Sequence, residues 1–142
     1  MKFCTPFDVL TVLNTFRDNM NNACAYANII GRTVTVTVDR PLFSVHPKHA
    51  VIYELNYGFV EGVLGGDNEW QDAYILGVDE PVATFDGVVI AVIVRLDDNE
   101  TKWVVAPVGK SYTREQIAQA VRFQEKYFHS YILTRATDGD VN

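Results

Sequence analysis

The stretch TVTVTVDR, residues 33–40, alternates threonine and valine without interruption. Because successive side chains of a β-strand point to opposite faces, this alternation predicts a strand with one face buried. Further segments rich in apolar, aromatic or β-branched residues predict strands at residues 50–60, 71–77, 88–96 and 101–107. Strands joined by such short connections favour a small closed or nearly closed barrel, which would extend over residues 33–107.

Helices are expected on both sides of this barrel. In an N-terminal extension, residues 1–32, the segment 6–19 begins with a proline, which suits the first position of a helix. After the barrel, Thr113 and Gln116 form a capping-box pattern, and apolar residues at helical spacing predict a helix over residues 113–133. The expected fold class is therefore α+β, mainly β, with a closed barrel flanked by N- and C-terminal helices.

Composition argues against several classes of protein. Hydrophobic residues make up 48% of the chain and charged residues 21%, which is typical of a packed globular domain, and 142 residues suit one domain. Cys4 and Cys24 have no metal-binding spacing and form no disulfide framework. The N-terminus lacks the apolar core of a signal peptide, and no apolar run approaches the ~20 residues that span a bilayer. We therefore expect a single cytoplasmic domain, residues 1–142, with no membrane partner.

Carboxylates concentrate in two predicted turns that border strands. They are Asp67, Glu69 and Asp72 in the first turn and Asp97, Asp98 and Glu100 in the second. Two carboxylates ~4 Å apart repel each other by about 4 kcal/mol at an effective dielectric constant of ~20, so clustered carboxylates shift their pKa values or bind cations. Sites made of oxygen ligands select hard ions, and Mg²⁺ is favoured when the substrate is a phosphate. The alternative is that these residues are solvated turn residues, which are common.

Several short motifs follow one another in an order that resembles the soluble inorganic pyrophosphatase family. They are NYGF at residues 56–59, the first acidic turn, DAYILG at 72–77, DDNETKWVVAP at 97–107 and FQEKYF at 123–128. The resemblance extends over residues 33–132, and VDRPLFSVHPKH, residues 38–49, looks like a short bacterial branch of the family. It implies an OB-like, five-stranded barrel and the metal-dependent hydrolysis of pyrophosphate to two phosphates. The implied cofactor is Mg²⁺, with other divalent cations as alternatives, and a homo-oligomer is compatible with the resemblance because family members often form oligomers.

The resemblance also implies roles for individual residues. Metal ligands are implied at Asp67, Asp72, Asp97 (or Asp98) and Glu100. Catalytic groups are implied at Glu69 as the general base that takes a proton from water, at Tyr57 near the nucleophile and at Tyr127 on the leaving phosphate. Substrate-binding cations are implied at Lys102 and expected at Arg40 and Lys48. In such a site, positioning and charge neutralisation supply most of the catalysis, and clustered metals lower the pKa of a bridging water.

Two departures from the family pattern leave the activity open. The middle acid of the first turn is Glu69 rather than Asp, and Phe128 stands where the family usually has Lys. Three interpretations follow: hydrolysis of pyrophosphate, hydrolysis of another phosphoanhydride such as a nucleotide, or a catalytically inactive binding or scaffold protein. A fourth, an OB-type nucleic-acid binder that stacks bases on Tyr53, Tyr57 and Tyr74, is opposed by the net charge of −6, so no nucleic-acid partner is expected.

Overall fold

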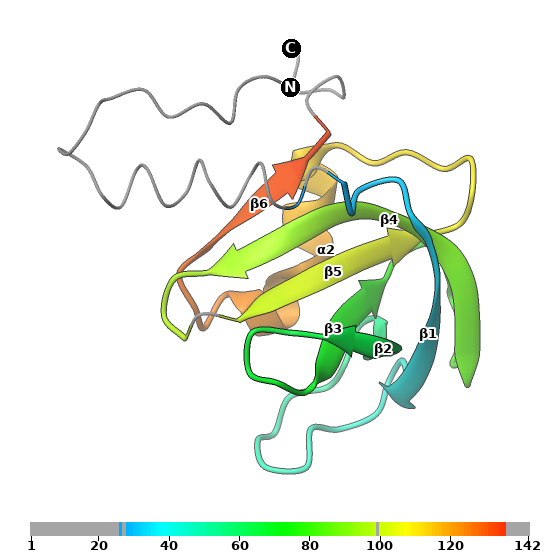
Figure 1. The fold of residues 1–142 in the computed structure, drawn as a ribbon. Coiled ribbons are helices and arrows are strands. Elements are labelled where there is room, and N and C mark those ends of the chain that lie inside the picture. The colour runs from blue at the N-terminus through cyan, green and yellow to red at the C-terminus, as the bar shows by residue number, and fades with distance from the viewer. Residues whose placement is uncertain (1–25, 27, 99, 136–142) are drawn as a thin grey trace, which may run out of the picture.

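The computed structural model describes residue 26 and residues 28–98 and 100–135 (Figure 1). The elements in this part of the chain are β1 (Thr33–Arg40), β2 (Asn56–Leu64), β3 (Trp70–Ile75), β4 (Thr84–Arg95), β5 (Thr101–Ala106), α2 (Arg114–Glu125) and β6 (Ser130–Thr134). The predicted helix over residues 6–19 lies outside the described residues, as do Cys4 and Cys24. No helix in the described part is long and apolar enough to cross a membrane.

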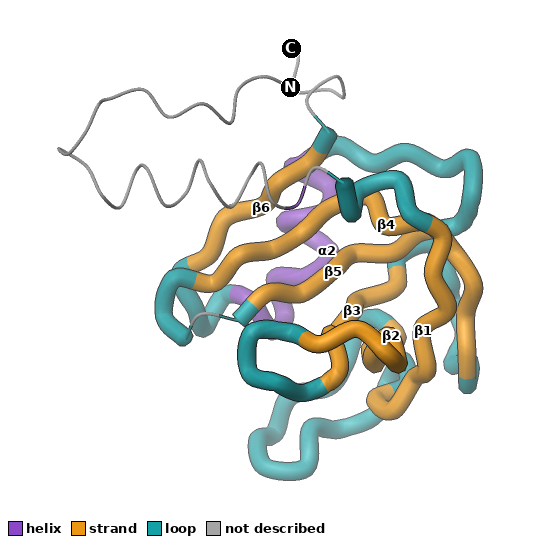
Figure 2. The backbone as a smooth tube through the Cα atoms, viewed as in Figure 1, coloured by secondary structure: helices purple, strands orange, loops and turns teal. Residues whose placement is uncertain are grey.

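Five strands close into a barrel because the first and last members of the ring pair with each other. The order around the ring is β1-β2-β3-β5-β4, and the first part of β4 pairs antiparallel with β1 (Figure 2). Only β3 and β5 run parallel among the paired strands of the described residues. The predicted fold class, a mainly β protein with a closed five-stranded barrel, is confirmed.

The predicted helix over residues 113–133 is wrong beyond residue 125. α2 ends at Glu125, and β6 follows at Ser130–Thr134, where it pairs antiparallel with the last residues of β4 outside the ring (Figure 1). The reason is tertiary, because β1 covers only the first part of one edge of β4 and leaves the rest of that edge to be paired. The segment SYILT of β6 is rich in aromatic and β-branched residues, which suit such an edge.

Two barrel strands begin at other residues than the sequence predicts. The strand expected over residues 50–60 begins only at Asn56, after a loop that carries an isolated β-bridge. The strand expected over residues 88–96 begins earlier, at Thr84, and its additional residues are the ones that pair with β1. The closure of the barrel therefore depends on residues that do not stand out in the local pattern.

Apolar side chains form one layer on each face of the barrel wall. The first layer draws on all five barrel strands and includes Val36, Ile75 and Trp103, so it fills the barrel interior. The second includes Tyr74 together with Ile117 of α2, so it lies between the outside of the wall and the helix. Strand residues that alternate with the interior positions therefore face α2, and this face carries the candidate site.

Gly58 lies where β1 and β2 come very close together. A Cβ at this position would collide with the carbonyl oxygen of Thr37 and would lie 2.7 Å from the Cα of Val38. We expect Gly58→Ala to lower the free energy of unfolding by about 1–3 kcal/mol, the usual cost of overpacking, as measured by urea denaturation. Gly65→Ala is the control, because a Cβ there would have no neighbour closer than the Oε1 atom of Gln71, at 3.3 Å. Equal unfolding midpoints for the two variants would contradict this prediction.

Candidate functional site

Three charged side chains stand on the outer face of the barrel wall, beside the C-terminal end of α2. Asp72 shares a face of β3 with Tyr74, because residues two apart on a strand point the same way, and Tyr74 packs in the layer under α2. The same alternation brings Lys102 of β5 and Arg95 of β4 to this face. Lys102 is only 4% exposed and Arg95 only 6%, so each must have a partner for its charge.

These side chains line a cavity with a volume of about 710 Å³. Its charged lining residues are Asp39, Arg40, Asp72, Arg95 and Lys102. Its aromatic and amide lining residues are His46, His49, Tyr53, Tyr57, Gln124, Tyr127 and Phe128. The cavity is thus enclosed by the barrel wall, by the loop between β1 and β2 and by the C-terminal end of α2.

Lys102 joins two carboxylates on the barrel wall. Its Nζ donates hydrogen bonds to Asp72 Oδ2 at 2.6 Å and to Glu100 Oε1 at 2.8 Å. Burial alone would lower the pKa of Lys102, but Tyr57, Asp72 and Glu100 outweigh it, so the pKa is raised and the side chain stays an ammonium ion. The ammonium nitrogen also lies 5.8 Å from the centroid of the Tyr57 ring.

A buried ion pair joins β4 to the end of α2. Arg95 donates from Nε and Nη2 to the two carboxylate oxygens of Glu125, with distances of 3.0 and 2.7 Å. Both side chains are 6% exposed. The Arg95 guanidinium also lies over the ring of Phe128, 3.6 Å from its centroid, as a cation–π contact. Arg95 also lies 3.4 Å from Asp98 and 3.9 Å from Glu100, but removal of Arg95 would leave the buried Glu125 carboxylate without its cation, so the pair holds the end of α2 against β4.

A chain of hydrogen bonds runs from Glu125 along the cavity wall to β1. Tyr74 Oη donates to Glu125 Oε2 at 2.6 Å, and Gln124 Nε2 donates to Tyr74 Oη at 2.7 Å. Gln124 Oε1 accepts from Tyr53 Oη at 2.7 Å, and Tyr53 Oη accepts from Arg40 Nη1 at 3.2 Å. Because Tyr74, Gln124 and Tyr53 are each bonded on both sides, these polar groups of the wall restrain one another.

Two titratable side chains of the cavity are neutral near pH 7. Burial raises the pKa of Tyr57, so its hydroxyl keeps its proton. Desolvation and the charge of Arg40 lower the pKa of His46. The Nδ1 atom of His46 accepts hydrogen bonds from the backbone N–H groups of Lys48 and His49, at 3.0 and 3.2 Å. The proton of this neutral imidazole therefore lies on Nε2.

The cavity brings together several of the residues predicted from the sequence. They are Arg40, Tyr57, Asp72, Lys102 and Tyr127. Glu100 reaches the same cluster through its hydrogen bond from Lys102. Tyr127 is 62% exposed and follows the end of α2, so it stands at the rim of the cavity.

Four other predicted residues do not line this cavity. Asp67 and Glu69 are exposed on the turn between β2 and β3, where Asp67 Oδ1 accepts from the backbone N–H of Glu69 at 3.0 Å. Lys48 is exposed on the loop between β1 and β2. Asp97 accepts from the backbone N–H of His129 at 2.8 Å, and this hydrogen bond is the largest cause of its lowered pKa.

The predicted metal ligands are not gathered around one point. Among residues 26, 28–98 and 100–135, no group of three or more His, Cys, Asp or Glu side chains could hold a metal ion. Asp39 and Asp72, however, both line the cavity, and burial raises the pKa of Asp39, with a smaller contribution from the charge of Asp72. Mg²⁺ is often bound through one or two carboxylates plus substrate phosphates. These two carboxylates therefore fit a cation that arrives together with a phosphate ligand.

Sequence reasoning gave no role to several residues of the cavity wall, among them Asp39, Arg95 and Gln124, and named Tyr53 only as a residue on which bases could stack. Gln124 carried a signal, because it is a polar residue on the apolar stripe of the predicted helix. Arg95 carried a weaker one, as a charge near the end of an otherwise apolar strand. Asp39 reaches the cavity from the end of β1, and Tyr53 reaches it through the fold of the loop between β1 and β2.

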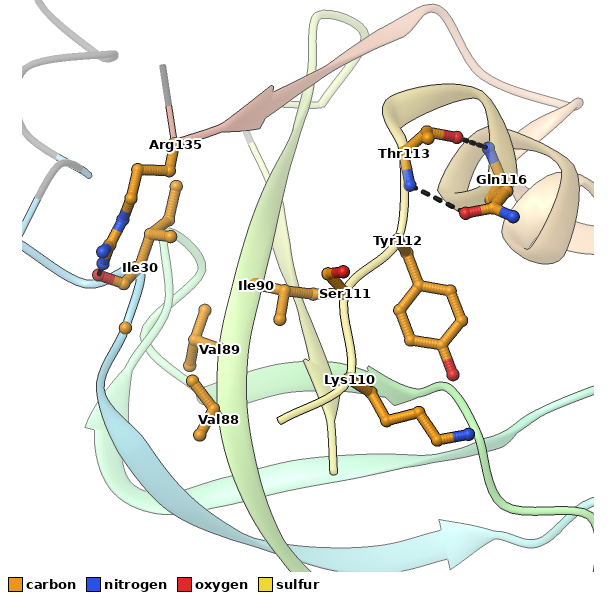
Figure 3. A pocket seen from close by; sticks show the side chains of 11 residues that line it. Ile30, Val88, Val89, Ile90, Lys110, Ser111, Tyr112, Thr113, Gln116 and Arg135 are labelled. Atoms are coloured by element: carbon orange, nitrogen blue, oxygen red, sulfur yellow. Dashed lines mark hydrogen bonds between the residues drawn. The ribbon is translucent and has the colours of Figure 1, made fainter. Parts of the chain in front are cut away.

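A second and smaller cavity, of about 410 Å³, lies at the N-terminal end of α2 (Figure 3). The dashed lines in Figure 3 mark the hydrogen bonds of the predicted capping box, Gln116 N to Thr113 Oγ1 at 3.0 Å and Thr113 N to Gln116 Oε1 at 2.8 Å. The charged residues of this cavity are Lys110 and Arg135, and Arg135 Nη2 donates to the carbonyl oxygen of Ile30 at 2.7 Å. None of the predicted site residues lines it.

Comparison with known proteins gives similarity in structure but not in sequence. No protein-family model matches the chain, and no curated protein matches it in sequence. An inorganic pyrophosphatase from Ehrlichia chaffeensis is similar with a TM-score of 0.58 and 15% identity, over 75% of this chain and 88% of that one. A structure described as an inorganic phosphatase from Anaplasma phagocytophilum is similar with a TM-score of 0.55 and 18% identity, over 74% of this chain and 86% of that one. An inorganic pyrophosphatase from Neisseria gonorrhoeae is similar with a TM-score of 0.52 and 17% identity, over 77% of this chain and 87% of that one.

These identities are too low to carry an activity from one chain to another, and they establish the fold alone. The closed barrel of β1 to β5, with α2 packed on its outer face, is the OB-like fold of the soluble inorganic pyrophosphatases.

Proposed function

We propose that this chain binds pyrophosphate or a related phosphoanhydride in the cavity beside α2, and that it hydrolyses this ligand with the help of a divalent cation, Mg²⁺ first of all. The observation that carries the proposal is the buried Lys102 ammonium, which lies between Asp72 and Glu100 in the wall of a cavity. The similarity in fold to proteins described as inorganic pyrophosphatases supports it.

The charges of the cavity account for both the ligand and the cation. Lys102 and Arg40 offer N–H donors to phosphoryl oxygens, and charge-assisted hydrogen bonds of this kind are the strong ones. The carboxylates of Asp39 and Asp72 would repel the same anion. A divalent cation between these carboxylates and the ligand would remove this repulsion, and when bound it would lower the pKa of a coordinated water.

The groups of the chain itself position and hold the ligand. Arg40 is bonded to Tyr53 and Lys102 to Asp72, so neither cation has to be ordered when the anion arrives. Tyr57 keeps its proton and can donate it in a hydrogen bond to an oxygen of the anion. In phosphoryl transfer such positioning and charge stabilisation do most of the work, because there is little covalent chemistry for protein groups to perform.

A second candidate function is binding without turnover. Glu69, the proposed general base, is exposed on the turn between β2 and β3 and does not line the cavity. A general base must come within hydrogen-bonding reach of the water that it activates, directly or through one further water. Hydrolysis through Glu69 therefore requires this turn to approach the ligand, whereas binding alone does not.

Substitution of Lys102 tests the proposed binding site. We expect Lys102→Met to weaken the binding of methylenediphosphonate, a pyrophosphate analogue that resists hydrolysis, by about 10- to 100-fold in Mg²⁺, the effect of one charge-assisted hydrogen bond. Isothermal titration calorimetry measures this affinity, and thermal unfolding checks that the variant is folded. Lys110→Met is the matched control, because Lys110 is exposed and lines the other cavity. An unchanged affinity in folded Lys102→Met would refute the proposed site.

Substitution of Glu69 separates hydrolysis from binding. We expect Glu69→Gln to lower the release of phosphate from pyrophosphate by about 100-fold or more, the typical contribution of a general base, while the affinity for methylenediphosphonate stays the same. A colorimetric phosphate assay measures the rate, with Glu61→Gln, another exposed carboxylate, as the control. Turnover equal to that of the unaltered chain would show that Glu69 is not the base. Tight binding with no turnover in the unaltered chain would favour the second candidate function.

A further inference from the structure

The cavity beside α2 is larger than an inorganic phosphoanhydride needs. Its volume is about 710 Å³, and clefts of ~300–1,000 Å³ enclose organic ligands of the size of a drug molecule. Pyrophosphate consists of two phosphoryl groups and presents no apolar surface. The charged residues Asp72, Arg95 and Lys102 belong to β3, β4 and β5, so they account for one wall of the cavity. β1 and β2 add Asp39, Arg40 and Tyr57, and the loop between these strands and the end of α2 supply the remainder.

This remaining wall is rich in aromatic rings. His46 and His49 come from the loop, with ring centroids 4.6 Å apart, and Tyr127 and Phe128 directly follow α2. Phe128 is covered by the guanidinium of Arg95, but Tyr127 is 62% exposed and His49 is exposed as well. Flat side chains that are accessible in this way stack on nucleobases regardless of the base, because every base has an aromatic face.

Backbone hydrogen bonds connect the two sides of the loop that carries the two histidines. The backbone N–H of His46 donates to the carbonyl oxygen of Val51 at 2.8 Å, and that of Tyr53 donates to Ser44 at 2.8 Å. The His46 ring lies within 11° of parallel to the Tyr53 ring. A wall that is already ordered loses little conformational entropy when a ligand binds, so it favours recognition of a planar group.

We propose that the ligand of this cavity is a nucleoside polyphosphate, with its phosphoanhydride against Lys102 and its base stacked on the aromatic wall at His49 and Tyr127. This inference rests on the proposed phosphoanhydride site and names the class of ligand that the site takes. The net negative charge of the chain does not oppose it, because the cation that accompanies the phosphates neutralises them locally.

A matched pair of ligands tests the inference by calorimetry in Mg²⁺. The methyl ester of methylenediphosphonate and the α,β-methylene nucleoside diphosphates share the same singly esterified, bridged diphosphonate with the same charge, and they differ in the nucleoside. We expect the nucleoside compounds to bind about tenfold more tightly or better, with little dependence on the base, since stacking does not read the base edges. Equal affinities would overturn the inference and leave the proposed function standing. If neither ligand binds, both proposals fail.

Variants of the aromatic wall check where the nucleoside binds. Tyr127→Leu and His49→Ala should each reduce the affinity ratio of the two ligands toward one, whereas Tyr127→Phe, which keeps the ring, should preserve it. Trp70→Leu is the control, because Trp70 is 43% exposed and does not line the cavity. Circular dichroism confirms that each variant is folded. If Tyr127→Leu and His49→Ala both leave the ratio unchanged, the nucleoside does not use this wall and the inference is wrong.

Discussion

The geometry of the candidate site depends on the buried ion pair between Arg95 and Glu125. Transfer of each ion from water to the interior costs several kcal/mol, which is offset only when the geometry is good and the remaining polar atoms are bonded. Here both oxygens of the Glu125 carboxylate accept from Arg95, and one also accepts from Tyr74. The end of α2 therefore cannot slide along β4 without exposing a charge to an apolar layer. The positions of Tyr127 and Phe128, which follow α2, depend on the same pair.

The second charged cluster decides what the cavity can bind. The charge of Lys102 is stabilised by Asp72 and Glu100 before any ligand arrives, so the wall is not a free patch of positive charge. An anion gains hydrogen bonds from Lys102 and Arg40 but meets the carboxylates of Asp39 and Asp72. This balance explains why the proposed ligand is a phosphoanhydride that brings a divalent cation with it.

Fold and activity rest on different observations in this protein. The similarity to solved pyrophosphatases, at 15–18% identity, concerns the path of the backbone, and the same fold can carry different chemistries. The site itself supports binding more directly than hydrolysis, because Lys102, Tyr57 and Asp72 line the cavity, whereas Glu69 does not. The aromatic wall adds flat ring surfaces, and inorganic pyrophosphate has no apolar group to place against them.

The sequence by itself determined the features that depend on neighbouring residues. Local patterns were enough to predict the strand β1 from its Thr–Val alternation, the capping box of Thr113 and Gln116, and the number of barrel strands. The spacing of apolar residues and the hydrogen bonds of a helix cap each involve only a few neighbouring residues. The resemblance of the motifs to the pyrophosphatase family also placed Lys102 and Asp72 in one predicted site, and both line the same cavity.

Only the tertiary structure decided the rest. β6 forms because β1 pairs with only the first part of β4 and leaves the last part of that edge available. The sequence of residues 130–134 does not show which distant strand they will pair with. The resemblance implied metal ligands in both acidic turns, and in space Asp67 and Glu69 lie outside the cavity that Asp72 lines. Which loops meet at a site depends on how the strands close and twist, and that is a property of the whole barrel rather than of any one stretch of sequence.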